Sequence, residues 1–267
     1  MLVVSVISLK GGVGKTSVTL GLAGAAWERG LRTLVLDLDP QGNASTVLDP
    51  ESVRFSASDV LADPRSGLLP HAIATSRWGP TVGVLAADSL LERHNALAGR
   101  DATLRLRIAL GGLNDWDLVL IDSPPSLAGL TRNALVASNY ALVVAEPSLF
   151  AVQGAQAALE AIDLVRADNL RLRPAGIVVN KLRMQSTEHR FRLDELRSAY
   201  AGLVLEPPLM DRTAIQQAEG ACVPVQAWRS PGAREVCDAF EDLLDQVLVL
   251  PSSEDGPLSG RVSPRLV

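Results

Sequence analysis

Short hydrophobic runs alternate with longer amphipathic stretches along most of this chain. Continuous apolar runs are typical of strands buried on both faces of a parallel sheet. Apolar residues that recur every three or four positions predict helices that cover such a sheet. The pattern therefore predicts an α/β fold, with a mostly parallel twisted sheet and helices on both faces. The predicted strands are 2–7, 32–38, 81–86, 117–122, 141–145 and 174–179, and the predicted helices are 18–27, 58–62, 88–97, 101–110, 131–138, 151–166, 188–200 and 233–249.

The chain of 267 residues is expected to form one domain, 1–250, followed by a tail. Residues 251–267 are rich in Pro, Ser and Gly and are expected to be disordered. No apolar stretch approaches the length of a membrane span, and no charged segment precedes the first apolar run, so a signal peptide is not indicated. Cys222 and Cys237 form no C-x-x-C pair, which favours free thiols in a reducing cytoplasm.

A glycine-rich turn, K-G-G-V-G-K-T at 10–16, follows the first predicted strand and precedes the first predicted helix. Glycines let backbone N–H groups crowd round phosphate oxygens, and the helix N-terminus adds partial positive charge. Lys15 is placed to reach the outer phosphates, and the Thr16 hydroxyl to coordinate Mg²⁺. Leu9 stands where the strict phosphate-loop pattern has a glycine. The expected nucleotide-binding residues of this segment are Lys10, Gly11, Gly12, Val13, Gly14, Lys15, Thr16 and Ser17.

Composition strengthens this interpretation. Of the 25 basic residues, 22 are arginines and three are lysines, at positions 10, 15 and 181. Lys10 and Lys15 therefore bracket a single turn. Lysine is a compact charge on a thin stem, which suits it to threading between backbone and phosphate better than the planar arginine fork.

Polar residues stand at the ends of several predicted strands. Asp37 and Asp39 close the second strand, Asp122 closes the fourth, and Glu146 and Asn180 follow the next two. Parallel sheets bind ligands at the carboxyl ends of their strands, so these side chains are expected to converge beside the glycine-rich turn. The alternative for D-x-D-P at 37–40 is a helix cap or turn, and an apolar run that ends in Asp is weak evidence alone.

Residues 10–16 resemble the deviant Walker A motif of the ParA/MinD family of ATPases. The stretch D-L-D-P-Q-G-N at 37–43 and the stretch D-S-P-P-S-L at 122–127 look like the boxes that follow it in that family. The resemblance covers roughly 2–248 and implies a P-loop ATPase with ATP and Mg²⁺ as cofactors.

The resemblance also implies roles for single residues. Lys10 is expected to reach across an ATP-sandwich homodimer to the partner's nucleotide. Asp39 is expected to position or activate the attacking water, so that Lys10, Lys15 and Asp39 act in hydrolysis. Thr16 and Asp122 are expected to hold Mg²⁺, with Asp37 as a supporting group.

Two residues are expected to contact the base. In the wider class of related NTPases an asparagine like Asn180 reads adenine, although asparagine also commonly caps strand ends. Met210 lies in L-M-D-R at 209–212, similar to the family's I-P-R segment near the base. Met210 and Asp211 depart from that pattern, which puts the base contacts there in question.

The net charge of −5 argues mildly against nucleic acid, but charge is unevenly distributed. Segment 164–197 holds eight basic and four acidic residues and so carries +4, which leaves −9 on the remainder. The plain alternative is a solvated helix face. The family implies an ATP-bound, nucleoid-associated dimer that binds DNA without sequence preference and whose hydrolysis a ParB-like protein stimulates. The candidate DNA contacts are Arg183, Arg190, Arg197, Arg212 and Arg234.

Two other functions fit the same scaffold. A MinD-like protein that docks on membranes needs a basic amphipathic C-terminal helix, whereas the charged residues of 233–249 are five acids and one arginine, so no membrane partner is expected. A metabolic ATP-dependent ligase would not call for Lys10, and an iron–sulfur carrier needs cluster cysteines that these two do not supply.

Overall fold

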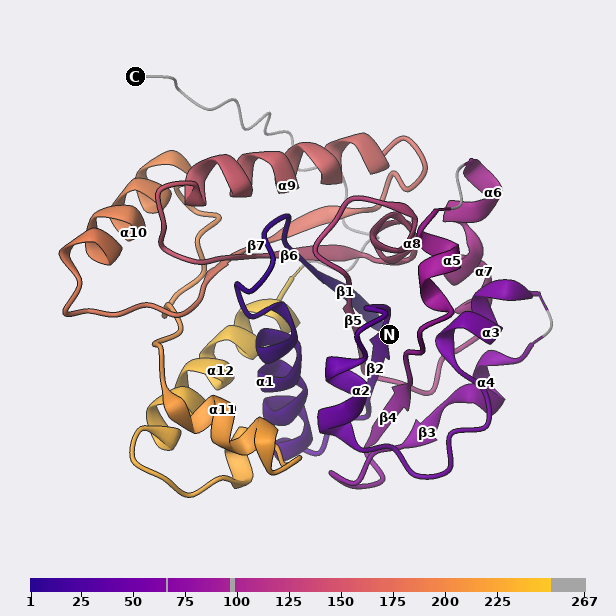
Figure 1. Ribbon diagram of the computed structural model, residues 1–267. Coiled ribbons are helices and arrows are strands. Elements are labelled where there is room, and N and C mark those ends of the chain that lie inside the picture. The colour runs from indigo at the N-terminus through magenta and orange to yellow at the C-terminus, as the bar shows by residue number, and fades with distance from the viewer. Residues whose placement is uncertain (66, 97–98, 251–267) are drawn as a thin grey trace.

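The computed structural model describes residues 1–65, 67–96 and 99–250 (Figure 1). The expected tail at 251–267 and the last residue of the predicted helix 88–97 lie outside the described residues. Within the described ranges, no helix is both long enough and apolar enough to cross a membrane. Cys222 and Cys237 are free thiols.

A seven-stranded sheet forms the centre of the fold, in the order β3-β4-β2-β5-β1-β6-β7. All neighbouring strands are parallel except the short edge strand β3, which pairs antiparallel with β4. The predicted α/β class with a mostly parallel sheet is confirmed. The strands are β1 (Leu2–Ile7), β2 (Thr33–Asp37), β3 (Ala74–Thr75), β4 (Val82–Leu85), β5 (Leu118–Asp122), β6 (Tyr140–Ala145) and β7 (Arg173–Val179).

Helices cover both faces of the sheet, with α9 over one face and α1, α11 and α12 against the other (Figure 1). The helices are α1 (Lys15–Glu28), α2 (Asn43–Leu48), α3 (Ala57–Ala62), α4 (Leu69–Ala72), α5 (Leu91–Asn95), α6 (Arg100–Thr103), α7 (Arg105–Ala109), α8 (Gly129–Ala137), α9 (Ala151–Val165), α10 (Thr187–Ala199), α11 (Thr213–Gly220), the 3₁₀ helix η1 (Val225–Ala227) and α12 (Ala233–Leu248).

The central strand β1 shows how the apolar runs are used. Val4 and Val6 face the core formed with α1 and α12, while Val3 and Ile7 face the cores on the opposite side. All four are buried, as a strand covered on both faces requires. Phe240 of α12 packs directly on α1 at Gly21, where a side chain would collide with its ring. This contact fixes the helix that begins at the glycine-rich turn.

The six predicted strands are confirmed, but the helix predicted at 101–110 is wrong as one element. It is broken into α6 and α7 because Asn133 of α8 intercepts a helical hydrogen bond. The Asn133 amide nitrogen donates to the Ala102 carbonyl at 2.7 Å, and its oxygen accepts the Leu106 N–H at 3.2 Å. Those two backbone groups are i and i+4 and would otherwise pair with each other.

Local capping accounts for a second difference. The helix predicted from 88 starts at Leu91 because Asp88 accepts the N–H groups of Leu90 and Leu91 at 2.7 and 3.2 Å. The short elements α2, α4 and β3 were not predicted, since none is long enough to show a hydrophobic period.

Candidate nucleotide-binding site

The glycine-rich turn connects β1 to α1 at the carboxyl edge of the sheet. Gly12 and Gly14 have φ of +78° and +88°, in the left-handed region that favours glycine. A side chain at Gly14 would also collide with the Asn180 amide. The turn is therefore restricted to glycine at this position both by its backbone and by its neighbour.

Lys15 is the first residue of α1 and lies almost entirely out of water, with 7% of its surface exposed. Burial lowers the pKa of its ammonium, while the charges of Asp122 and Asp39 raise it. The balance is a lowered pKa, which means that two nearby carboxylates do not fully compensate the loss of solvent. An anionic ligand would supply the missing compensation.

Thr16 and Asp122 lie together beneath the turn. The Thr16 hydroxyl donates to Asp122 Oδ2 at 2.7 Å, although 106 positions separate the two residues. Burial and the charge of the neighbouring Asp37 together raise the pKa of Asp122 to about 7, against the Thr16 hydrogen bond and the Lys15 charge, which lower it.

Asp37 is held firmly from the loop that leads into α2. Its Oδ2 accepts the backbone N–H and the hydroxyl of Ser45, both at 2.7 Å, and its Oδ1 accepts the Asp39 N–H at 3.1 Å. Burial raises the pKa of Asp37 to about 6. Asp37 and Asp122 are register partners on β2 and β5, so the two buried carboxyls sit side by side.

This donor set fits Mg²⁺. The ion prefers oxygen ligands and is usually bound by one or two carboxylates together with substrate phosphates. Asp122 and the Thr16 hydroxyl supply hard oxygens, and the two buried carboxyls lack a full counter-charge. No group of three His, Cys, Asp or Glu side chains is gathered for a metal in the described ranges, so phosphate oxygens would complete the coordination.

A cavity of about 700 Å³ opens above the turn. Asp39 lines it, with Oδ1 accepting the Gln41 N–H at 3.0 Å. Part of the remaining wall comes from the turn itself and from the stretches 37–43 and 122–127, and the rest comes from residues that the sequence did not indicate. The lining residues are Gly12, Gly14, Lys15, Thr16, Ser17, Asp39, Pro40, Gln41, Asn43, Thr46, Val47, Glu92, Asn95, Pro124, Pro125, Ser126 and Glu219.

Glu219 is the most notable of the unpredicted lining residues. It lies on α11, and burial raises the pKa of its carboxyl, against a hydrogen bond with Ser17 and the charge of Lys181. The only sequence signal for it was its place in the 209–225 segment, whose likeness to a base-proximal segment pointed to this region.

Lys10 differs from Lys15 in its exposure and in its surroundings. Its side chain is 52% exposed, it does not line the cavity, and its Nζ lies 3.1 Å from Glu146 Oε2. Glu146 follows β6, so the predicted convergence of these two residues at one sheet edge is present. An exposed pair of this kind contributes little stability and separates easily.

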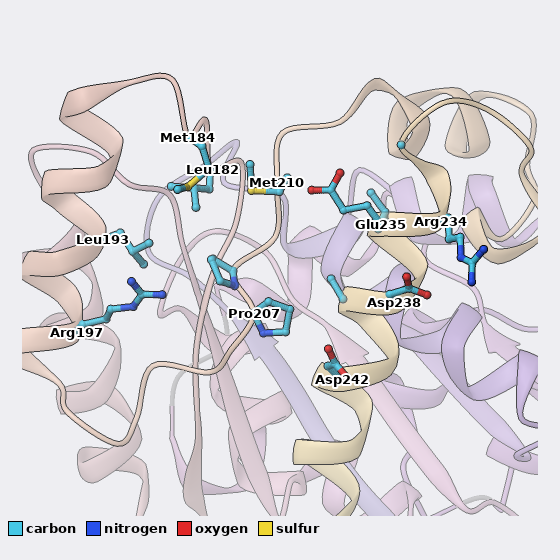
Figure 2. A pocket seen from close by; sticks show the side chains of 14 residues that line it. Leu182, Met184, Leu193, Arg197, Pro207, Met210, Arg234, Glu235, Asp238 and Asp242 are labelled. Carbon is cyan, nitrogen blue, oxygen red and sulfur yellow. The ribbon is translucent and has the colours of Figure 1, made fainter.

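The two predicted base-contact residues lie on paired segments, since the Leu182 N–H donates to the Leu209 carbonyl at 2.9 Å, but their side chains have different surroundings. Asn180 donates its amide to the Val13 carbonyl at 2.8 Å and so contacts the turn. Met210 instead lines a second cavity of about 790 Å³, a groove between α10 and α12 (Figure 2). The base-contact role of Met210 stays a prediction.

The predicted DNA-contact arginines do not form one unpaired patch. Arg183 pairs with Asp211 at 2.7 Å, Arg197 with Glu206 at 2.8 Å and Arg212 with Glu235 at 2.7 Å. Figure 2 shows Arg197 and Arg234 on opposite sides of the groove. Among the described residues, Arg190 and Arg234 have no carboxylate within ion-pair distance.

Comparison with known proteins gives concordant results. A family model described as an AAA domain matches residues 1–173. The chain is 32% identical over 251 residues to the chromosome-partitioning ATPase Soj of Thermus thermophilus, covering 92% of this chain and 94% of Soj. It is also 32% identical to protein IncC of Escherichia coli over 239 residues, but spans only 66% of IncC.

Among solved structures, cobyrinic acid a,c-diamide synthase from Mycobacterium smegmatis with bound ADP and magnesium superimposes with a TM-score of 0.75. That protein is 29% identical, and the match covers 92% of this chain and 93% of the synthase.

Proposed function

Because the chain belongs to the ParA/MinD family of ATPases, with ATP and Mg²⁺ as its cofactors, we propose that it is a DNA-partitioning or positioning switch. ATP is held between two protomers, and the resulting homodimer binds DNA of the nucleoid without sequence preference. A ParB-like partner protein stimulates hydrolysis, which returns the protomers to the monomeric state.

The observation that carries this proposal is the separation of the two lysines of one turn. Lys15 is buried and faces its own cavity, whereas Lys10 is half exposed and faces Glu146. A lysine that served its own nucleotide would be expected inside the cavity. The position of Lys10 supports a role on a nucleotide that a second protomer brings.

Exposed apolar side chains beside Glu146 support the carboxyl edge of the sheet as the dimer surface. Leu149 and Phe150 follow Glu146 at the end of β6 and are 60% and 63% exposed. Large apolar side chains at this exposure are suited to contact with another protein. A second copy seated over the nucleotide edge would cover them.

In the proposed mechanism the chain first binds the phosphates. The N–H groups of the turn and the Lys15 ammonium hold them, while Thr16 and Asp122 would hold Mg²⁺, which supplies charge neutralisation when bound. Asp37 stays behind them, fixed by Ser45.

Asp39 is the group placed to act on water. One of its oxygens accepts the Gln41 N–H, and the other has no hydrogen-bond partner in the described part of the chain. That second oxygen can accept a hydrogen bond from water and hold it in line with the terminal phosphate. Binding and hydrolysis thus depend on different residues.

The experiment that tests the proposal is Lys10→Ala. The variant should keep its affinity for ADP within about threefold, because Lys10 is outside the cavity, and should lose dimerisation with ATP. Binding of a fluorescent ADP analogue and the mass in solution measure the two effects. A large loss of ADP affinity would show that Lys10 serves its own site and would contradict the proposal.

For DNA, the arginines without carboxylate partners are the better candidates. Arg190 lies on α10 and donates to the Met184 carbonyl at 2.7 Å, which leaves its charge unneutralised. Dimerisation would place two copies of Arg190 and Arg234 on one body, which makes ATP-dependent DNA binding a consequence of the dimer.

A second candidate is an ATP-dependent metabolic enzyme, favoured by the 29% identity to cobyrinic acid a,c-diamide synthase. The two candidates are separated by measuring ATP hydrolysis with duplex DNA and with cobyrinic acid. Stimulation by DNA alone supports the switch, and turnover that requires the small molecule supports the enzyme.

A further inference from the structure

All three lysines of this arginine-rich chain lie at the phosphate-binding turn. Lys10 and Lys15 belong to it, and Lys181 reaches it from the end of β7. The Lys181 ammonium donates to the Gly12 carbonyl at 2.5 Å, across 169 positions of sequence. No local pattern relates Lys181 to the turn, so only the fold reveals the contact.

The hydrogen bond from Lys181 lies beside a second hydrogen bond to a backbone carbonyl of the turn. The preceding residue, Asn180, donates its amide to the Val13 carbonyl at 2.8 Å. Two consecutive residues after β7 therefore hold two consecutive carbonyls of the turn. In a trans peptide the carbonyl and the following N–H point in opposite directions. Holding the carbonyls of Gly12 and Val13 towards β7 thus turns the N–H groups of Val13 and Gly14 away from β7.

The cavity above the turn lies on the side away from β7, because Asp39 and Pro124 in its wall follow β2 and β5, which are across β1 from β7. Gly12 and Gly14 line the cavity above the turn together with Lys15. Backbone N–H groups gathered in such a concave turn form an anion-binding nest. The two contacts from β7 therefore fix the orientation of the donors on which phosphate binding depends.

The backbone at Lys181 is unusual. Its φ is +59°, in the left-handed region that is unfavourable for a residue with a side chain. The conformation is held from both sides, by Asn180 N–H to the Ala145 carbonyl at 2.8 Å and by Leu182 N–H to the Leu209 carbonyl at 2.9 Å. A glycine would adopt it more readily, so the lysine side chain must contribute something that glycine lacks.

The space around the contact explains the choice of lysine. The Lys181 Cε lies 3.7 Å from where a Cβ on Gly14 would be, so the stem passes close along the turn. A thin ammonium fits there, whereas the planar guanidinium fork is wider and donates in fixed directions.

We propose that Lys181 is a positioning residue for nucleotide binding, which together with Asn180 clamps the phosphate-binding turn in its receptive conformation. The proposal deepens the proposed function and rests on it, because it requires that this turn binds ATP and ADP.

Lys181→Met removes the donor and keeps the length of the stem. Affinity for ADP and ATP should fall about tenfold or more, since a lost hydrogen bond from a charged donor loosens the turn. KM for ATP should rise while kcat changes less than threefold, because the contact acts equally on substrate and transition state. Arg54→Met removes the same charge from an exposed surface position and should change neither value.

Lys181→Gly separates positioning from folding. The melting temperature should equal or exceed that of the wild type, since glycine relieves the left-handed backbone. ADP affinity should nevertheless fall as far as in Lys181→Met. The affinity of Lys181→Arg for ADP should also stay well below that of the wild type. Wild-type ADP affinity in Lys181→Gly would overturn the clamp, because it would show that no side chain is needed. Wild-type ADP affinity in Lys181→Arg would also overturn it, because it would show that only the positive charge matters.

A spectroscopic readout follows from the composition. Protein labelled with ¹³C-lysine has three ε-CH₂ signals, which Lys10→Arg, Lys15→Arg and Lys181→Arg assign. Adding ADP and Mg²⁺ should shift the signals of Lys15 and Lys181. A Lys181 signal that does not respond at saturating ADP would contradict the clamp.

The outcomes separate this inference from the function on which it rests. Wild-type protein that binds neither ADP nor ATP would overturn both. Wild-type protein that binds them, with Lys181→Met and Lys181→Gly binding equally well, would overturn only the clamp.

Discussion

The molecule has two cavities of similar size that are built in opposite ways. The cavity above the phosphate-binding turn is about 700 Å³, and the groove between α10 and α12 is about 790 Å³. Lys15 in the wall of the first cavity, and Asp37 and Asp122 beneath the turn, are buried, and loss of solvent displaces their pKa values. In the groove, Arg197 and Glu235 are exposed and already paired with neighbouring side chains.

The volume of a cavity alone therefore does not identify the ligand site. In the groove, Arg197 and Glu235 are paired with Glu206 and Arg212, and the exposed side chains of Arg234, Asp238 and Asp242 are solvated. The carboxylate charges beneath the turn are made unfavourable by loss of solvent, and hydrogen bonds from groups such as the Thr16 and Ser45 hydroxyls compensate them only in part. A bound nucleotide with its metal ion would compensate them, which is why strongly perturbed groups in a cleft indicate function.

The largest expected effect is on hydrolysis. Asp39→Ala should lower kcat by about a hundredfold or more, because a positioned base contributes that much. Its ADP affinity should stay within about threefold, since Asp39 holds water and not phosphate. Asp238→Ala in the groove is the matched removal of a carboxylate and should leave both values unchanged. Turnover of Asp39→Ala at the wild-type rate would show that Asp39 does not act on the attacking water.

The next effect is on affinity. Lys15→Ala should weaken ATP binding about a hundredfold, because two hydrogen bonds from a charged donor are lost. Titration calorimetry measures it, with Arg54→Ala as the control for net charge. Equal affinity in Lys15→Ala and wild type would mean that the buried ammonium is structural.

The buried carboxyls predict a pH effect on stability. Burial raises the pKa of Asp37 to about 6 and of Asp122 to about 7, from 3.8. The folded chain therefore binds more protons than the unfolded chain between about pH 4 and 7, and the free energy of unfolding falls as the pH rises through this window.

The melting temperature of the nucleotide-free protein should accordingly be lower at pH 8 than at pH 5.5. Asp122→Asn should flatten this dependence, as should ADP with Mg²⁺ in the wild type. A melting temperature that increases from pH 5.5 to pH 8 is the contrary result.

The smallest expected effect compares a paired arginine with an unpaired one. If the ATP-bound dimer contacts DNA through α10, Arg190→Ala removes two phosphate contacts and should flatten the log–log salt slope by about 2 units. Arg197→Ala should flatten it less, because Glu206 already neutralises that guanidinium. DNA affinity measured against salt tests this, and an unchanged slope in Arg190→Ala would exclude Arg190 as a contact.

Much of the fold and the centre of the site could be predicted because their signals are local. Apolar runs identified the strands, and the glycine-rich turn and Asp122 were predicted to converge at one sheet edge, where the Thr16–Asp122 hydrogen bond joins them. Features that depend on distant residues could not be predicted. Asn133 breaks the helix at 101–110, and Lys181 reaches Gly12 across 169 positions. Neither leaves a periodic pattern or a spacing in the sequence.

Light scattering after size exclusion measures whether ATP joins two protomers. Asp39→Ala, which should retain ATP without hydrolysing it, is measured with ATP and Mg²⁺ and then with ADP and Mg²⁺. We expect twice the protomer mass of 28.3 kDa with ATP and the protomer mass with ADP. The protomer mass in both nucleotides, with ATP shown to be bound, would contradict it.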